Sequence, residues 1–221
     1  MRPIVACLAA CVLWAAAGAH ASTLNFDSLP NASVVFYGDT DTFTFLPEGS
    51  GYDFQISSAA NAADADTVGL VGNIEGTFSI GPISTPFPNV QTASVGGTGL
   101  FSIRDEDGVS LQSSITWKDV MTVGAGGLLN VSGLMNVTGV TYTGTNADLM
   151  HLVTAENGAA VVTFQFVPPK SLTQLTTDGK TYATSYSGSV VPEPATLFLL
   201  GSGLTGLGAY RNWKERRRGR R

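Results

Sequence analysis

Cysteine is almost absent from this 221-residue chain, and both cysteines, Cys7 and Cys11, lie within the first 21 residues. If that segment is removed, the remaining chain has no thiol, which excludes disulfide bonds, cysteine nucleophiles, zinc–cysteine sites and iron–sulfur clusters. Histidine is equally scarce, because His151 is the only one after residue 21. A zinc site built from three or more His and Cys ligands is therefore excluded as well.

Basic residues are the second shortage. Between Ser22 and Val190 the chain has four Lys or Arg against fifteen Asp or Glu, a net charge of −11. A nucleic-acid partner is not expected, because contacts to phosphates need Lys and Arg. No G-x-S-x-G motif nominates a serine nucleophile, and nothing selects one carboxylate pair for glycoside hydrolysis. We therefore expect no enzyme, although a site gathered in three dimensions around His151 stays open.

The first 21 residues have the pattern of an export signal. Arg2 supplies a positive charge, Ile4–Ala17 an apolar stretch, and Ala19-His20-Ala21 a cleavage site before Ser22. The apolar stretch is shorter than the about 20 residues that a membrane-spanning helix needs. We expect cleavage between Ala21 and Ser22. An uncleaved anchor and a lipoprotein acylated at Cys11 are the alternatives.

The end of the chain combines three features in order: Pro192-Glu193-Pro194, an apolar run from Ala195 to Tyr210, and a basic cluster. As a transmembrane helix the run would rise about 24 Å, slightly less than a hydrocarbon core about 30 Å thick. The positive-inside rule would keep the cluster in the cytoplasm and the bulk of the chain outside. The residues that would anchor this topology are Arg211, Lys214, Arg216, Arg217 and Arg218.

Residues 191–221 resemble a PEP-CTERM sorting signal, because the Pro-Glu-Pro triplet, the apolar segment and the terminal arginines occur in that order. The resemblance implies that an exosortase, a membrane transpeptidase-like enzyme of Gram-negative bacteria, reads Pro192, Glu193 and Pro194 and removes the tail. It also implies an intermediate anchored in the inner membrane and release to the cell surface or extracellular matrix, with exopolysaccharide as a partner. A plain single-span anchor after a proline-rich linker is the alternative.

Residues 22–190 lie between the signal peptide (1–21) and the sorting segment (191–221), and they predict an antiparallel, jelly-roll-like β-sandwich. This segment is rich in Gly, Thr, Ser and Val, and short β-prone runs recur between turn residues. The clearest hairpin joins Gly99–Arg104 to Val109–Trp117 through Asp105-Glu106-Asp107-Gly108, since Asp-Gly favours a tight turn. The other predicted strands are Thr23–Phe26, Ser33–Tyr37, Thr42–Phe45, Tyr52–Ser57, Gly76–Ile80, Ala159–Phe166 and Thr181–Val190.

Several regions have no clear strand pattern. Ser58–Asp66, Pro82–Asn89 and Gly124–Gly127 are rich in small or turn-forming residues, and Asn146–Glu156 fits either a helical turn or a strand. The triplets Asn130-Val131-Ser132 and Asn136-Val137-Thr138 match the glycosylation acceptor pattern. We interpret them as turns.

No cofactor is expected, and calcium is the one metal for which the sequence offers ligands. Asp39-Thr40-Asp41, Asp64-Ala65-Asp66 and Asp105–Gly108 place oxygen donors on predicted loops, without the spacing of an EF-hand. Solvated turns explain the same clusters. Aromatic residues would stack on sugars if exposed, or fill the core if not: Tyr52, Trp117, Tyr142, Tyr182 and Tyr186. The leading hypothesis is a non-enzymatic surface or matrix protein. A carbohydrate-binding module, assisted by calcium, is the alternative, and a secreted hydrolase is the third class.

Overall fold

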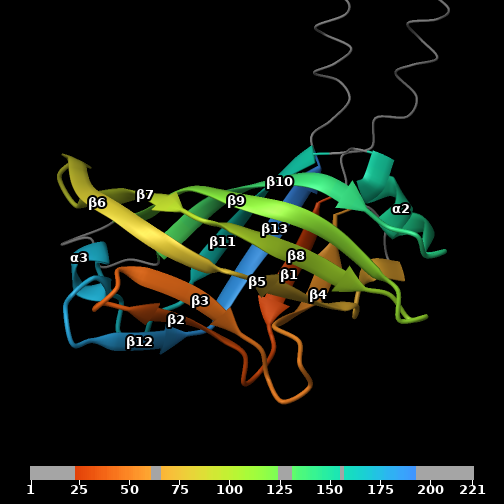
Figure 1. The fold of residues 1–221 in the computed structure, drawn as a ribbon, viewed down its shortest axis with the longest axis horizontal. Coiled ribbons are helices and arrows are strands. Elements are labelled where there is room, and N and C mark those ends of the chain that lie inside the picture. Colours follow the sequence, from red (N-terminus) through yellow and green to blue (C-terminus); the bar gives the residue numbers. More distant parts are fainter. Residues whose placement is uncertain (1–22, 61–65, 124–130, 155–156, 193–221) are drawn as a thin grey trace, which may run out of the picture. The chain divides into compact units, whose positions relative to one another are not determined.

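Thirteen strands and two short helices follow one another in the part of the chain that the computed structural model describes, residues 23–60, 66–123, 131–154 and 157–192 (Figure 1). The strands are β1 (Leu24–Ser28), β2 (Ser33–Tyr37), β3 (Thr42–Leu46), β4 (Phe54–Ala59), β5 (Val71–Glu75), β6 (Thr77–Phe87), β7 (Val90–Gly96), β8 (Thr98–Arg104), β9 (Ser110–Val123), β10 (Val131–Thr141), β11 (Asn157–Phe164), β12 (Thr181–Thr184) and β13 (Tyr186–Pro192). The helices are α2 (Ala147–Thr154) and α3 (Leu172–Leu175).

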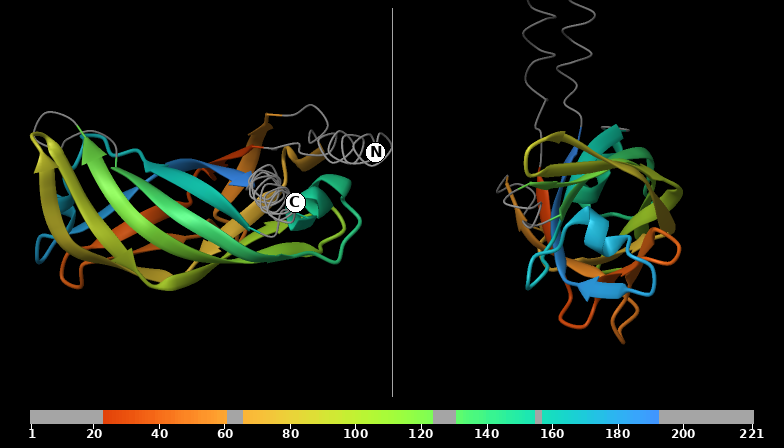
Figure 2. Two further views of the ribbon diagram at one scale, coloured as in Figure 1. Left: turned by 90° about the horizontal axis from the view of Figure 1, so that it is seen from above. Right: turned by 90° about the vertical axis from the view of Figure 1, so that its left-hand side faces the viewer.

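The strands close into a barrel, which corrects the predicted sandwich. Eight of them form a ring in the order β1, β4, β5, β8, β9, β10, β11 and β13, and β13 pairs again with β1. All of these pairs are antiparallel. The end-on view in Figure 2 shows this ring. A sandwich would instead keep two separate sheets face to face.

Two glycines let long strands change partners. The chain passes from β5 into β6 through Gly76 and from β7 into β8 through Gly97, with φ angles of 138° and 108° that favour glycine. Beyond these bends, β6 pairs with β7 and with β3, and the sheet continues through β2 to β12. The barrel wall is therefore extended past the eight-stranded ring.

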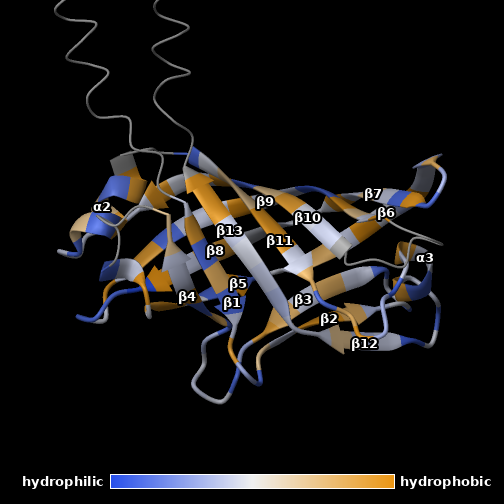
Figure 3. Cartoon of the chain, turned by 180° about the vertical axis from the view of Figure 1, so that it is seen from behind, coloured by the Kyte–Doolittle hydropathy of each residue, from blue (hydrophilic) through white to orange (hydrophobic). Residues whose placement is uncertain are grey.

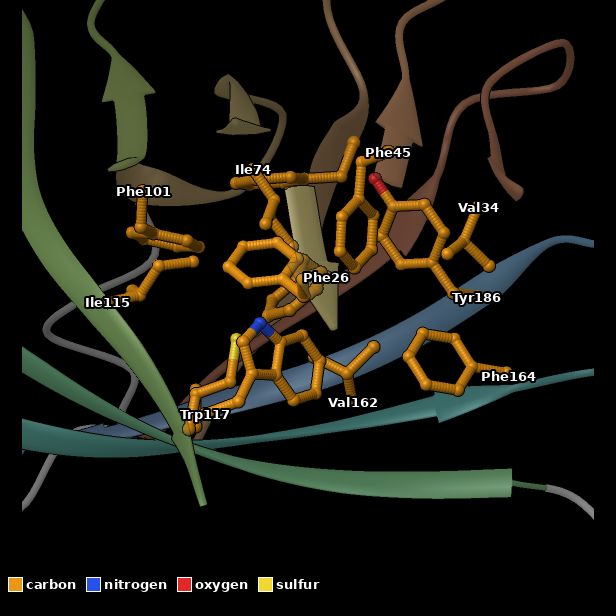
Figure 4. Close-up of a cluster of buried hydrophobic side chains, with 14 of the residues drawn as sticks. Phe26, Val34, Phe45, Ile74, Phe101, Ile115, Trp117, Val162, Phe164 and Tyr186 are labelled. Atoms are coloured by element: carbon orange, nitrogen blue, oxygen red, sulfur yellow. The ribbon is translucent and has the colours of Figure 1, made fainter. Parts of the chain in front are cut away.

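Inward-facing side chains fill the barrel (Figure 4). In β9, Leu111, Ser113, Ile115 and Trp117 are all buried, as the alternation predicts. The ring of Trp117 lies 5.1 Å from that of Phe43, measured between centroids. Aromatic side chains bury about 150–250 Å² each, so they dominate the energetics of such a core. A cavity of about 20 Å³ beside Leu111 has room for about one water molecule.

The best local patterns are confirmed. β8 and β9 form the predicted hairpin, with Arg104 opposite Ser110. In β11 and the residue pair after it, Val162, Phe164 and Phe166 are buried while Val161 is 44% exposed. Each position matches the alternation of a strand with one face on the core.

Two regions predicted to be irregular or turn-like form strands instead. β6 extends to Phe87, and β10 contains both Ser132 and Thr138 of the supposed turns. Among the described residues, β6 pairs only with β7 from Gly81 onward. Prolines are tolerated on such an edge because they lack only a hydrogen bond that no neighbour would accept. Of the other predicted irregular regions, Ser58 and Ala59 belong to β4, and residues 61–65 and 124–127 lie outside the described residues.

The ambiguous segment after β10 forms a helix. The side-chain oxygen of Asn146 accepts hydrogen bonds from the backbone amides of Asp148 (3.1 Å) and Leu149 (3.0 Å). An asparagine in this position satisfies amides that the first helical turn leaves unpaired. Leu149 and Leu152 are buried, so α2 packs its apolar side against the barrel.

Candidate functional site

The last strand of the barrel runs into the predicted sorting motif. β13 pairs with β1 on one side and with β11 on the other, where Pro192 lies opposite Gly158. The backbone is therefore held in the sheet up to the first residue of the Pro-Glu-Pro triplet. Among the residues that the structure describes, no helix is long and apolar enough to cross a membrane.

The remaining residues of the predicted signals lie outside the described part of the chain. These are Ala21 and Ser22 at the predicted cleavage site, Glu193 and Pro194 of the triplet, the apolar run 195–210, and the basic residues Arg211, Lys214, Arg216, Arg217 and Arg218. Their roles stay predictions.

Three adjacent strands, β10, β11 and β13, contain no Asp, Glu, Lys or Arg. We call them the uncharged wall, and Figure 3 views the barrel from their side. The register aligns Ser132, Thr163 and Ser187 in one row across the three strands. Most outward positions carry hydroxyl or amide groups, namely Ser132, Asn136, Thr138, Asn157, Thr163, Ser187 and Ser189, and the apolar Leu134, Val161 and Val191 lie among them. This part of the surface presents neutral donors and acceptors in rows.

The alternation of buried and outward residues along each strand determines which side chains the uncharged wall exposes. Val137 and Met135 in β10, Ala160 and Val162 in β11, and Val190 in β13 are buried. The residues between them therefore face outward. The wall was not predicted because two triplets in and next to β10, which forms one side of the wall, were interpreted as turns. Absence of charge alone would not have found it, because β2, β3, β4, β6, β7 and β12 also contain no Asp, Glu, Lys or Arg.

The acidic cluster at Asp105 stabilises the β8–β9 turn. One carboxylate oxygen of Asp105 accepts a hydrogen bond from the backbone amide of Val109 (2.7 Å), and the other accepts one from the hydroxyl of Tyr142. That hydroxyl also accepts a bond from the amide of Asn146 (3.0 Å). Burial raises the pKa of Asp105, but the bonds from Tyr142 and the turn amides outweigh it, so the pKa lies below its ordinary value.

The other candidate calcium ligands are separate from this turn. The Asp39 carboxylate accepts a hydrogen bond from the amide of Gly179, and Asp64 lies outside the described residues. Within the described ranges, no three His, Cys, Asp or Glu side chains come together in a group that could hold a metal ion.

The five aromatic residues considered for sugar stacking differ in their exposure to solvent. Trp117 and Tyr186 are 5% and 1% exposed, so the hypothesis that they stack on a ligand is wrong. Tyr52, Tyr142 and Tyr182 are half-buried. The ammonium group of Lys170 lies 4.9 Å from the centre of the Tyr182 ring, which places a cation on that face. His151 is exposed on α2.

Asp53 is a buried carboxylic acid that no sequence pattern distinguishes from a surface aspartate. It is 1% exposed, and one side-chain oxygen accepts a hydrogen bond from the backbone amide of Ile74 (2.7 Å). Its other oxygen and the hydroxyl of Tyr186 have no hydrogen-bond partner among the described residues. Burial raises the pKa of Asp53 to about 6. Burial, with the nearby Asp53, also raises the pKa of Tyr186.

Comparison with known proteins supports the interpretation of the C-terminus. Residues 190–217 match the family model described as the PEP-CTERM protein-sorting motif. The search of curated proteins and the search of solved structures found no match to the chain. The match begins within β13 and includes the whole Pro-Glu-Pro triplet. Residues 190–217 are thus a PEP-CTERM protein-sorting motif, and the protein is a secreted one that an exosortase sorts toward the cell surface.

Proposed function

We propose that the barrel is a non-enzymatic component of the cell surface or extracellular matrix, and that it associates with uncharged polysaccharide through the uncharged wall. The observation that carries this proposal is the row of Ser132, Thr163 and Ser187 across three neighbouring strands that contain no charged residue. Ser, Thr and Asn side chains donate and accept hydrogen bonds as sugar hydroxyls do. Each such bond contributes about 0.5–1.5 kcal/mol net.

A polymer suits this surface better than a small ligand. The wall presents its hydroxyl and amide groups in cross-strand rows such as Ser132, Thr163 and Ser187. Single contacts of this kind are weak, but a repeating polymer engages many at once, and linked contacts raise the effective concentration of one another. The expected binding is therefore weak for one sugar unit and stronger for a long chain.

The negative charge of the domain favours uncharged polysaccharides over anionic ones. Residues 22–190 carry a net charge of −11, and a field of that sign repels anionic polymers. The wall itself contains no charge that a uronic acid or sulfated sugar would require. An uncharged polysaccharide is the partner that both features favour. Neither catalysis nor a cofactor forms part of this proposal.

The test is affinity electrophoresis of the purified full-length protein in gels that contain dextran, galactomannan or alginate. The two uncharged polymers should retard the protein, and the anionic alginate should not. Thr163→Glu introduces a charge at the centre of the wall and should abolish most of the retardation. Ser102→Glu makes a similar change on β8, outside the wall, and is the matched control.

Two results would contradict the proposal. If neither uncharged polymer retards the wild-type protein, the polysaccharide association is wrong. If Thr163→Glu and Ser102→Glu reduce the retardation equally, the wall is not the surface that binds. Circular dichroism of both variants checks that the barrel is still folded.

A further inference from the structure

A groove of about 350 Å³ opens beside the outer part of β6. Its lining includes Asp41 and Thr176 with the apolar residues Ile80, Pro82 and Ile83. The volume falls in the lower part of the range of about 300–1,000 Å³ that small-molecule pockets occupy. The lining combines hydrogen-bonding and apolar residues, which is the usual composition of such pockets.

The groove exists because β3 is shorter than β6. The two strands pair only between Thr42–Thr44 and Thr77–Ser79. From Gly81 onward, β6 has β7 on one side and the groove on the other. The carbonyl of Asp41 accepts a hydrogen bond from the amide of Ile80 (2.6 Å), which fixes the turn before β3 against β6.

The opposite side of the groove is also held in place. Thr176 follows α3, whose first turn is closed by reciprocal hydrogen bonds between Ser171 and Gln174. The side chain of Gln91 on β7 bonds both the hydroxyl and the amide of Thr173 in α3, at 3.0 and 3.2 Å. Groups that are ordered before a ligand arrives lose less conformational entropy when it binds.

Asp41 differs from the aspartates that stabilise turns elsewhere in the barrel. The carboxylates of Asp39 and Asp105 accept hydrogen bonds from backbone amides. The carboxylate of Asp41 is engaged by no hydrogen bond or ion pair within the described residues, and the residue is exposed. It is therefore available to accept hydrogen bonds from a ligand, and bonds to an ionised acceptor are stronger than neutral ones.

The groove favours a sugar over a peptide. A peptide strand that extended the sheet at β6 would need backbone amide donors along the edge, but Pro82 and Pro86 have none. A sugar ring presents apolar C–H groups, which suit the half-buried Ile83 and the exposed Pro82, and hydroxyls, which suit Asp41 and Thr176. A carboxylate at the rim also disfavours anionic sugars, in agreement with the charge of the whole domain.

We propose that this groove binds a short, uncharged segment of a saccharide, with Asp41 accepting hydrogen bonds from its hydroxyls. The inference rests on the proposed function for the class of ligand. It adds a discrete site on a different part of the barrel, so the domain binds single sugar segments in the groove and long chains along the uncharged wall.

Isothermal titration of the full-length protein with isomaltotriose and mannotriose tests the groove. Asp41→Asn removes the charge but keeps the backbone, because asparagine also tolerates the left-handed φ of 49° found at this position. The variant should bind the trisaccharide about tenfold more weakly. Glu106→Gln changes an exposed acid on the β8–β9 turn and should bind like the wild type.

The outcomes separate the two proposals. If Asp41→Asn binds like the wild type, the role of Asp41 in the groove is wrong, while the wall stays supported by the Thr163→Glu result. If uncharged polymers retard the wild type but no trisaccharide binds, the discrete site is wrong and the proposed function stands. If neither polymer nor trisaccharide binds, both proposals fail. Unchanged thermal unfolding of the variants shows that the fold is intact.

Discussion

Replacing Asp53 with asparagine should stabilise the folded barrel above pH 6 relative to the wild type and have a much smaller effect at pH 4. The Asp53 carboxyl is 1% exposed, and one of its oxygens has no hydrogen-bond partner among the described residues. Burial raises its pKa from 3.8 to about 6 because the charged form loses its hydration. The folded state therefore prefers the neutral acid.

The direction of the pH dependence follows from this difference. An acid whose pKa is higher in the folded state binds its proton more tightly there than in the unfolded chain. The resulting stability is complete below pH 3.8, declines as the pH rises, and is lost once the pH passes about 6. The interval between the two pKa values corresponds to about 3 kcal/mol. Asparagine does not ionise, and its side-chain oxygen can still accept the hydrogen bond from Ile74.

Urea unfolding between pH 3.5 and 8, followed by tryptophan fluorescence, measures this effect. The free energy of unfolding of Asp53→Asn minus that of the wild type should grow by about 3 kcal/mol from pH 3.5 to pH 8, with most of the increase between pH 4 and pH 6.5. Taking the difference removes the contribution of carboxylates that both proteins share. Asp27→Asn makes the same substitution at an exposed carboxylate on β1 and is the matched control. A pH-independent difference for Asp53→Asn would refute the reasoning.

Two further predictions concern the ends of the barrel. Tyr142→Phe should lower the free energy of unfolding by about 1–3 kcal/mol, because the hydroxyl bonds both Asp105 and the amide of Asn146. The effect should fade as the pH falls below 3.8, where Asp105 becomes protonated in the unfolded chain. Urea unfolding with Tyr52→Phe as the control measures it, and an equal effect of both variants would contradict it. Glu193→Ala should leave the chain unprocessed, seen as a larger band on immunoblots of cell fractions, whereas Glu215→Ala, in the same tail, should be processed. Normal processing of Glu193→Ala would show that Pro-Glu-Pro is not read as expected.

Local features of the barrel could be predicted from the sequence. The β8–β9 hairpin is one, because Asp107-Gly108 favours the turn and Phe101, Ile103, Leu111 and Ile115 alternate on both sides of it. The sorting motif is another, because its three features are contiguous in the chain. Both depend only on residues that are close in sequence.

The closure of the barrel could not be predicted in the same way. A sandwich and a barrel use the same alternation along each strand, and they differ in whether β9 and β10 pair. β10 was not predicted as a strand because glycine occupies the inward position 133 and a leucine occupies the outward position 134, which breaks the alternation of apolar and polar residues. The prolines of β6 likewise suggested a loop, since only the fold shows that this segment lies at an edge.

The role of Asp41 in the groove and the burial of Trp117 and Tyr186 could not be predicted either, because both depend on the three-dimensional fold. Asp41 and Asp39 look alike in the sequence, but only the fold brings Asp41 beside Ile80 and leaves its carboxylate without a partner in the described residues. Trp117 and Tyr186 were candidates for sugar stacking, yet they are the largest inward-facing side chains of their strands. Burial depends on the face of each strand, and a single aromatic residue does not reveal its face.

The pairing of β1 with β13 has a consequence for export. Leu24 lies opposite Ala59 of β4 on one side and opposite Val190 of β13 on the other, so the first strand can pair early with β4 but finds its second partner only when nearly the whole domain is available. Contacts between distant parts of a chain form slowly because a long loop must close first. The barrel is therefore closed by the strand that leads directly into the sorting motif, so the ring cannot be complete before the residues next to that motif are available for pairing.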